Sequence, residues 1–149
     1  MNNNNYTILH LHTDFSSVTT NIDSVTKYTD YIDKAKELNM KAIAFSEHGN
    51  MFSWEKKMQY CKDNNIKYIH GVEAYVTENL EEKIRDNYHI CLYAKNTEGF
   101  YELNKLISNA SNRKDGHYYF SPRITFDELL NISNNIIVTT ACLGGILAK

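Results

Sequence analysis

The sequence predicts an α/β fold, in which strands and helices alternate along a chain of 149 residues. Short apolar runs such as Lys41–Ser46 have the composition of buried strands. They alternate with stretches such as Ser24–Asn39, whose apolar residues recur at spacings of three and four. Strands joined by helical connections are typical of a mostly parallel sheet, either open or closed into a barrel. We therefore expect one domain, or part of one, built on such a sheet.

A strand, a loop and a helix are expected at the start of the domain. Residues 1–5 contain four asparagines in a row and are expected to be a disordered leader to a domain at 6–149. Alternation in Tyr6–Thr13 predicts a strand, and the polar stretch Asp14–Asp23 has no apolar period and predicts a loop. The spacing of apolar residues in Ser24–Asn39 predicts the first helix.

The middle of the chain predicts three strands and a helix. Lys41–Ser46 is a buried strand, and the helix Met51–Asn64 ends at a pair of asparagines. Lys67–Thr77 is a longer strand in which Gly71 is expected to mark a kink, and Tyr88–Ala94 is the next strand.

The last third predicts two helices, a strand and a turn. Thr97–Ala110 carries apolar residues on one side of a helix. Phe126–Leu130 is a short helix after the only proline, Pro122. Asn135–Thr140 is a strand, and the chain turns away from it at Leu143–Gly145.

Composition excludes several classes of protein. The net charge of −2 gives no basic field for strong nucleic-acid binding by this chain alone. The three cysteines, Cys61, Cys91 and Cys142, are odd in number and widely spaced, which favours a reducing, cytoplasmic location over a disulfide framework. No run is apolar enough to span a membrane, so we expect no membrane partner.

A His-x-His pair is the strongest indication of function. His10 and His12 are two residues apart in a strand, so their imidazoles are expected to point the same way and form half of a metal site. Three further possible ligands, His48, Glu73 and Cys142, lie at or near the ends of other predicted strands. Because parallel sheets carry their chemistry at the C-terminal ends of strands, we expect these side chains to cluster.

The other histidines and cysteines fit this scheme less directly. His89 opens its strand, so either that strand runs antiparallel to the others or its predicted register is wrong. His70 and His117 are expected to be surface or packing residues. Cys61 and Cys91 lie in apolar elements and are expected to be buried thiols.

This set of side chains points to metal-assisted hydrolysis of a phosphoester. Imidazole, carboxylate and thiolate suit Zn²⁺, and with more oxygen ligands Mn²⁺ or Fe²⁺. A carboxylate such as Glu73 can bridge two metals, which together activate water and hold a phosphoester. No Gly-rich phosphate loop and no G-x-S-x-G motif is present, so nucleotide-cofactor and serine-hydrolase functions have no support.

Several stretches, in order, carry a resemblance to a known family. H-L-H-T-D-F-S, A-K-E-L-N-M-K-A-I-A-F-S-E-H-G-N-M-F and I-K-Y-I-H-G-V-E-A-Y-V resemble the PHP (polymerase and histidinol phosphatase) domain. N-Y-H-I-C-L-Y-A-K-N-T-E-G-F-Y-E-L-N-K-L-I-S, Y-Y-F-S-P-R-I-T-F-D-E-L-L and I-I-V-T-T-A-C-L-G-G narrow it to the N-terminal domains of bacterial replicative DNA polymerase III alpha subunits. The resemblance covers nearly the whole chain, from Tyr6 to about Ile146.

The resemblance implies a distorted (β/α)₇ barrel with up to three divalent metals, Zn or Mn, at its strand ends. It places His89 in the site, which favours an error of register over an antiparallel strand. The positions that match the family's metal ligands are His10, His12, His48, Glu73, His89 and Cys142. No catalytic residue is assigned by this match.

The chain departs from the family's pattern at three points. The family's early aspartate ligand falls on either Thr19 or Asp23, depending on how the loop is counted, and Glu47 stands where the family usually has Asp. The family's final D-x-H ligands, last barrel strands and polymerase domains would lie beyond Lys149. We therefore expect the N-terminal part of a barrel that cannot polymerise DNA by itself and that is poorly soluble, oligomeric or dependent on a partner segment when isolated.

Three functions are compatible with the sequence. The first is a metal-dependent 3′→5′ exonuclease or phosphoesterase site within the polymerase. The second is a catalytically inactive module that stabilises the polymerase and docks partners, with metals serving folding. The third is a small-molecule phosphatase similar to histidinol phosphatase. For the first two, the implied partners are the remainder of the alpha chain, DNA bound through the full polymerase, and other replisome subunits.

Overall fold

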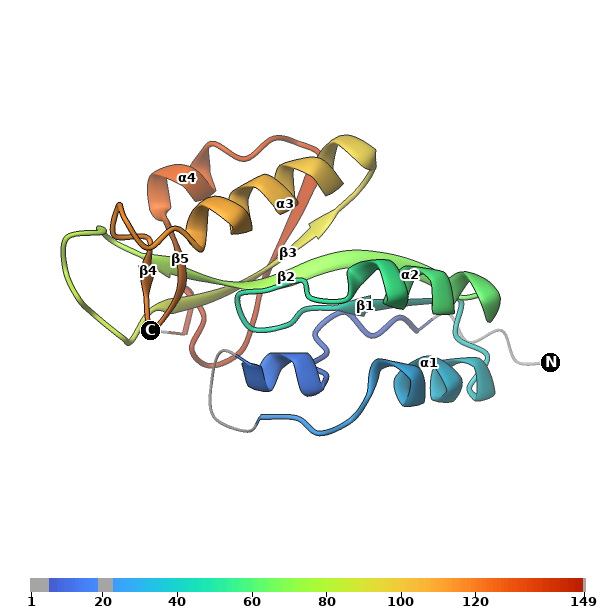
Figure 1. Ribbon diagram of the computed structural model, residues 1–149. Coiled ribbons are helices and arrows are strands. Elements are labelled where there is room, and N and C mark those ends of the chain that lie inside the picture. The colour runs from blue at the N-terminus through green and yellow to red at the C-terminus, as the bar shows by residue number, and fades with distance from the viewer. Residues whose placement is uncertain (1–5, 19–22, 149) are drawn as a thin grey trace.

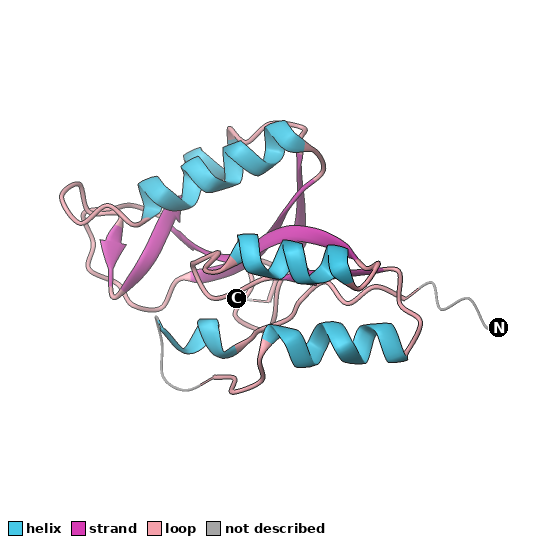
Figure 2. Cartoon of the chain, turned by 45° about the vertical axis from the view of Figure 1, so that its right-hand side comes forward, coloured by secondary structure: helices cyan, strands magenta, loops and turns pink. Residues whose placement is uncertain are grey.

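The computed structural model describes residues 6–18 and 23–148 and shows a twisted sheet between two groups of helices (Figure 1). Helices α3 (Thr97–Ala110) and α4 (Phe126–Leu130) lie on one side, and α1 (Tyr28–Glu37) lies on the other (Figures 1 and 2). Helix α2 (Trp54–Asp63) packs beside the sheet and against α1. The α/β class predicted from the sequence is confirmed, and the expected leader at 1–5 lies outside the described residues.

The sheet contains parallel and antiparallel pairs. Its order is β4-β5-β2-β3-β6, and β1 also pairs with β2. The β1–β2 and β2–β5 pairs are parallel, and the other three are antiparallel. The strands are β1 (Ala42–Phe45), β2 (Lys67–Thr77), β3 (Tyr88–Ala94), β4 (Tyr118–Tyr119), β5 (Ser121–Thr125) and β6 (Ile136–Thr140).

The expectation of a mostly parallel sheet is therefore wrong. Residues 78–87 join β2 to β3 and contain no helix. This connection is shorter than the dozen or more residues that a parallel crossover needs, so β3 returns antiparallel along β2. The length of the segment between β2 and β3 is therefore a sequence signal for their antiparallel orientation.

The predicted first strand at Tyr6–Thr13 is also wrong. This segment runs beside β1, and its Ile8 and Leu11 carbonyls accept the N–H groups of Ala44 and Ser46 at 3.0 and 2.9 Å. Among the described residues the pairing amounts to a bridge between Ile8 and Ile43 rather than a ladder. The Ser46 hydroxyl accepts the Leu11 N–H at 2.9 Å, so a side chain takes the place of a backbone partner. The predicted loop that follows begins with a 3₁₀ helix at Asp14–Val18.

Strands β4 and β5 are missing from the sequence prediction. Pro122 lies inside β5, and proline usually argues against a strand with neighbours on both sides. Arg123 follows it and is 1% exposed, which no apolar pattern would indicate. Its guanidinium donates to backbone oxygens of Glu82 and Gly116, at 3.0 and 2.6 Å, and these bonds compensate its burial.

The remaining boundaries differ from the predictions by little. Strands β2 and β3 and helices α3 and α4 have the predicted bounds. Helix α1 begins at Tyr28 and α2 at Trp54, each three or four residues later than predicted. No helix in the described parts of the chain is both long enough and apolar enough to cross a membrane.

Alternation along β2 separates the core from the site. Val72, Ala74 and Val76 point into the main core, where they pack with Leu103 and Ile107 of α3. The residues between them therefore point to the opposite face of the sheet, which includes Glu73. A second core, formed by α1, α2 and β1, supports the segment beside β1.

Candidate metal centre

Glu73 of β2 lies at the centre of the predicted site and is 1% exposed. A buried carboxylate needs partners, because its transfer out of water is costly. Histidine nitrogens from four positions surround its two oxygens. Oε1 lies 3.5 Å from His10 Nε2 and 3.2 Å from His89 Nδ1, and Oε2 lies 3.3 Å from His12 Nε2 and 2.8 Å from His48 Nδ1.

These contacts determine the charge of Glu73. Burial alone would raise its pKa, but hydrogen bonds from the surrounding imidazoles outweigh burial and hold the pKa far below its usual range. Glu73 is therefore an anion at neutral pH. A buried anion within reach of several nitrogen donors provides the charge that a divalent cation would neutralise.

His10 and His12 converge as the spacing predicts, although their segment is not a regular strand. Their Nε2 atoms lie 2.9 Å apart. Hydrogen bonds with Cys91 and Glu73 raise the pKa of His10 to about 10, against the opposing effect of burial. His10 therefore carries a proton at neutral pH in the chain without metal, and a metal would have to displace that proton.

His48 joins the site where the chain leaves β1. A parallel bridge pairs it with Glu73, and the Gly49 N–H donates to the Glu73 carbonyl at 2.9 Å. Its Nε2 lies 3.2 Å from Asp23 Oδ2. Burial alone would lower the pKa of His48, but Glu73 and Asp23 raise it. Asp23 therefore lies within ligand distance of the cluster, whereas Thr19 lies outside the described residues.

The antiparallel direction of β3 explains the position of His89. His89 is the register partner of Tyr75 in β2, so the start of β3 lies beside the C-terminal half of β2. An error of register is not the explanation, because β3 has the predicted bounds. Cys142 follows β6, and its Sγ lies 3.3 Å from His89 Nδ1 and 3.8 Å from Glu73 Oε1.

All six side chains predicted as ligands thus meet at one place, together with Asp23. Their ligand atoms form three groups in which every pair of atoms lies within 4.8 Å. The groups are His10, His12 and Glu73; His12, Asp23 and His48; and Glu73, His89 and Cys142. Nitrogen, oxygen and sulfur donors in this arrangement fit zinc or a similar divalent metal. The first group shares His12 with the second and Glu73 with the third.

The sequence did not predict that Ser16 contacts His12 at Nδ1, the ring nitrogen that faces away from Glu73. Ser16 Oγ lies 2.8 Å from His12 Nδ1, and the 3₁₀ helix at Asp14–Val18 brings the serine there. The signal was available in part, since a hydroxyl four residues after a histidine can reach it when the intervening chain turns. A predicted loop gave no reason to expect that turn.

The other histidines and cysteines have the roles predicted for them. His70 is 4% exposed, and burial lowers its pKa to about 4. His117 is half-buried, and its Nε2 lies 3.2 Å from Oε1 of Glu128 in α4. Cys61 and Cys91 are free thiols with no exposed surface.

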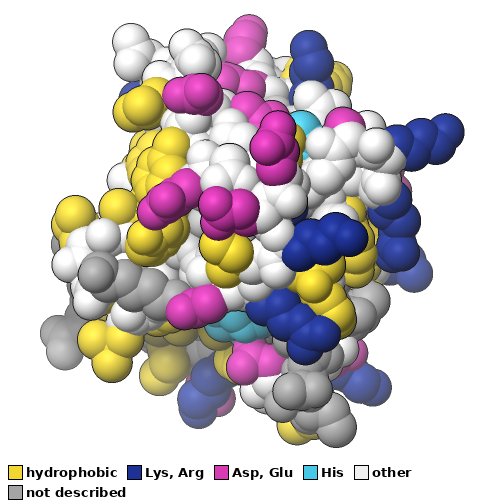
Figure 3. All heavy atoms as spheres, turned by 90° about the vertical axis from the view of Figure 1, so that its left-hand side faces the viewer, with side chains coloured by type: hydrophobic (Ala, Val, Ile, Leu, Met, Phe, Trp, Pro, Cys, Tyr) yellow, Lys and Arg dark blue, Asp and Glu magenta, His cyan; other side chains and the backbone are white. Residues whose placement is uncertain are grey.

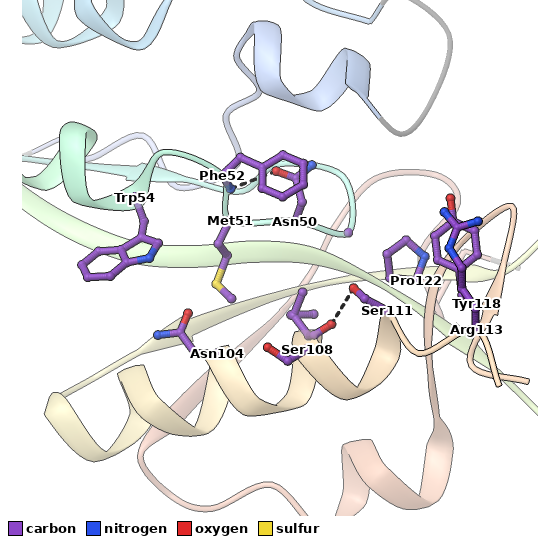
Figure 4. A pocket seen from close by; sticks show the side chains of 12 residues that line it. Asn50, Met51, Phe52, Trp54, Asn104, Ser108, Ser111, Arg113, Tyr118 and Pro122 are labelled. Carbon is purple, nitrogen blue, oxygen red and sulfur yellow. Dashed lines mark hydrogen bonds between the residues drawn. The ribbon is translucent and has the colours of Figure 1, made fainter. Parts of the chain in front are cut away.

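The cavity in Figure 4 is separate from these ligands. It has a volume of about 680 Å³ and begins at Gly49, directly after His48. Met51 and Trp54 line one side, and Asn104 and Ser108 of α3 line the other (Figure 4). None of the side chains in the three groups lines it, so the cavity and the cluster are two distinct features of the structure.

Comparison with known proteins agrees with this geometry. The family model of the PHP domain matches residues 9–149. DNA polymerase III subunit alpha of Borreliella burgdorferi is 40% identical over 147 residues, which cover 95% of this chain and 12% of that protein. The same subunit of Helicobacter pylori strain 26695 is 40% identical over 146 residues, covering 96% and 12%. The chain therefore spans about 12% of the length of these relatives.

Among solved structures, an amidohydrolase from Chromobacterium violaceum has 19% sequence identity and a TM-score of 0.48. The match covers 69% of this chain and 34% of that protein.

Proposed function

The chain belongs to the PHP domain family, and from this we propose that it is the N-terminal metal-binding region of a DNA polymerase III alpha subunit acting in DNA replication. Support comes from curated relatives that are 40% identical over almost the whole chain. Because those relatives are much longer, the first partner we propose is the rest of the polymerase chain. DNA and other replisome subunits, in the cytoplasm, are further proposed partners.

We further propose that the cluster around Glu73 hydrolyses phosphodiester bonds at DNA 3′ ends. The observation that carries this proposal is that Glu73 belongs to two groups of donors, one with His10 and His12 and the other with His89 and Cys142. A bridging carboxylate is the usual way for a protein to hold two metals a few Å apart. The proposed cofactor is zinc or manganese, with up to three ions.

Each residue of the cluster would have its own role in holding the metal ions. Glu73 would supply negative charge to two ions, while His10 and His12 would hold one side and His89 and Cys142 the other. When bound, such ions supply Lewis acidity and an activated water. The raised pKa of His10 means that metal binding and loss of the His10 proton are coupled. The buried position of Glu73 keeps bulk water away from the charge at the centre.

The surface gives this region little means to hold DNA alone. Figure 3 shows one face that carries both charges, with Asp and Glu side chains over its centre and Lys and Arg side chains mainly along its right-hand side. The net charge of −2 agrees with that mixture. We therefore propose that the rest of the polymerase brings the DNA end to the site, and that the isolated chain binds DNA weakly.

The test is hydrolysis by the metal-loaded chain. A single-stranded DNA labelled at its 5′ end and a panel of small phosphate monoesters are incubated with the Mn²⁺- or Zn²⁺-loaded protein, with Glu73→Gln as the inactive variant and Glu55→Gln as control. Shortening of the DNA from its 3′ end, lost in Glu73→Gln and retained in Glu55→Gln, supports the proposal. Hydrolysis of monoesters alone would indicate a small-molecule phosphatase. Bound metal without any hydrolysis, at DNA concentrations high enough to saturate weak binding, would overturn the nuclease proposal and favour a structural module.

A further inference from the structure

Glu47 is a buried carboxylate next to the cluster that the proposed chemistry does not use. It is 1% exposed, and its two oxygens accept hydrogen bonds from three residues. Thr13 donates its N–H to Oε2 at 2.9 Å and its hydroxyl to Oε1 at 2.5 Å. Lys57 donates to Oε1 at 2.6 Å, and Ser16 Oγ lies 2.5 Å from Oε2.

This geometry directs the proton of the Ser16 hydroxyl toward Glu47. A carboxylate only accepts, so Ser16 must donate to Glu47. Ser16 has one hydroxyl proton, and it can therefore act only as an acceptor toward His12 Nδ1, at 2.8 Å. The His48 N–H, 3.3 Å away, donates to the same oxygen. It follows that His12 carries its proton on Nδ1.

We propose that Glu47, acting through Ser16, is a positioning residue that fixes the tautomer and ring orientation of His12. With Nδ1 protonated and held by Ser16, Nε2 is the His12 nitrogen that faces Glu73 and His10, where the metal is proposed to bind, and its lone pair would be the one offered to the metal. Metal-ligating histidines commonly depend on such a partner at their second nitrogen. This inference rests on the proposed metal site for its purpose, although the arrangement itself is present without a metal.

The position of Lys57 strengthens the arrangement. Its ammonium is 5.0 and 5.2 Å from the ring centroids of Phe45 and Phe15 and is almost completely buried. It donates to Oε1 of Glu47, whereas Ser16 donates to Oε2, so both carboxylate oxygens are held. A network that served stability alone would not need the hydroxyl directed at His12, so the two roles can be separated by experiment.

The first readout is the ¹⁵N chemical shift of the His12 ring nitrogens, measured in the metal-free chain. We expect His12 Nδ1 to have the shift of a protonated nitrogen, whatever the state of Nε2. In Ser16→Ala that proton loses its acceptor, so the Nε2–H tautomer should appear and the Nδ1 proton should exchange faster with water. An unprotonated Nδ1 in the wild-type chain would overturn the inference.

The second readout is the affinity for Zn²⁺ alone, measured by competition with a chelating dye. We expect Ser16→Ala and Glu47→Gln to weaken binding by about 10- to 100-fold, as removal of an outer-shell partner commonly does. Ser108→Ala, on an exposed position of α3, should leave affinity and the His12 shifts unchanged.

The two readouts separate this inference from the proposed function. If the wild-type chain binds no Zn²⁺, the proposed metal site fails, while the ring shifts still decide the tautomer. If Zn²⁺ binds and Ser16→Ala changes neither the affinity nor the shifts, the inference fails and the metal site stands. Because Ser16→Ala removes a single atom, it also serves if Glu47→Gln does not fold.

Discussion

Glu73 Oε2 lies 2.8 Å from His48 Nδ1, and the same two residues form a parallel bridge. This bridge extends the pairing between β1 and β2 beyond the last residue of β1. Two backbone hydrogen bonds hold the bridge: Glu73 N–H donates to the Glu47 carbonyl at 3.1 Å, and Gly49 N–H donates to the Glu73 carbonyl at 2.9 Å. The position of the central carboxylate is thus set by the sheet itself. A site built on strands in this way is held more precisely than one built on loops.

Replacing the central carboxylate should remove the metal and leave the fold. Glu73→Gln keeps the shape of the side chain but removes the charge that two groups of donors share. We expect Zn²⁺ affinity to fall by more than roughly 100-fold, beyond the range typical of outer-shell changes. Isothermal titration with Zn²⁺ measures this directly. Glu55→Gln on the exposed side of α2 is the matched control, and equal affinities in the two variants would contradict the role of Glu73.

Without metal, stability should fall as pH rises above neutrality. The pKa of His10 is about 10 in the folded chain, above the ordinary histidine value of 6.5, so the folded state keeps a proton that the unfolded state loses. That contribution is complete below pH 6.5 and is lost progressively toward pH 10. The raised pKa of His48 acts in the same direction. Urea unfolding in the presence of EDTA at pH 7 and pH 9 should give lower stability at pH 9.

The variant His10→Gln tests the origin of that slope. A neutral amide does not titrate, so the decrease between pH 7 and pH 9 should be smaller than in the wild-type chain. A slope of the same size in His10→Gln would show that other groups cause it. With Zn²⁺ present the trend should reverse for the wild-type chain, because binding requires an unprotonated His10.

Gly99 should not tolerate alanine, although it lies in a helix. Alanine is favoured over glycine in helices by about 1 kcal/mol. A Cβ at Gly99, however, would collide with the backbone carbonyl oxygen of Asn135, which also accepts the Lys95 N–H. We expect a net loss of about 1–3 kcal/mol in the free energy of unfolding. Ser108→Ala in the same helix should be neutral or slightly stabilising, and a stabilised Gly99→Ala would refute the close approach.

Lys57→Met should be strongly destabilising, because it leaves Glu47 buried without its cation. Both residues are 1% exposed, and Lys57 Nζ lies 2.6 Å from Glu47 Oε1. Removing one partner of a buried ion pair typically costs about 3–5 kcal/mol. Lys56→Met, at the exposed neighbouring position, should change stability by less than about 0.5 kcal/mol. Similar urea midpoints for the two variants would contradict a buried pair.

Much of the fold was predictable where the pattern was strong. Strands β2 and β3 and helix α3 have the predicted bounds, because each combines a clear period with flanking turn residues. The segment before β1 was not predictable in this way, since alternation alone does not distinguish a regular strand from an extended segment that forms a single bridge and bonds one N–H to the Ser46 side chain. Strand β5 was missed because Pro122 and Arg123 break the apolar pattern.

The site was predicted in composition but not in arrangement. His10 and His12 could be placed together from their spacing, and the other predicted ligands from their positions near strand ends. The direction of β3 decides where His89 lies, and that direction depends on a connection too short for a crossover. The hydrogen bonds that link Glu47, Ser16 and His12 could not be predicted, because they depend on a 3₁₀ turn that brings Ser16 within reach of His12 Nδ1.

The most direct test of the account is the metal content of the chain, measured by elemental analysis after dialysis against metal-free buffer. The wild-type chain and the double variant His12→Ala, Glu73→Ala are compared after the same loading with Zn²⁺ or Mn²⁺. We predict two or more ions in each wild-type chain and loss of these ions in the variant, because both altered residues are shared between groups of donors. A wild-type chain that retains no metal would contradict the central claim that these side chains form a metal centre.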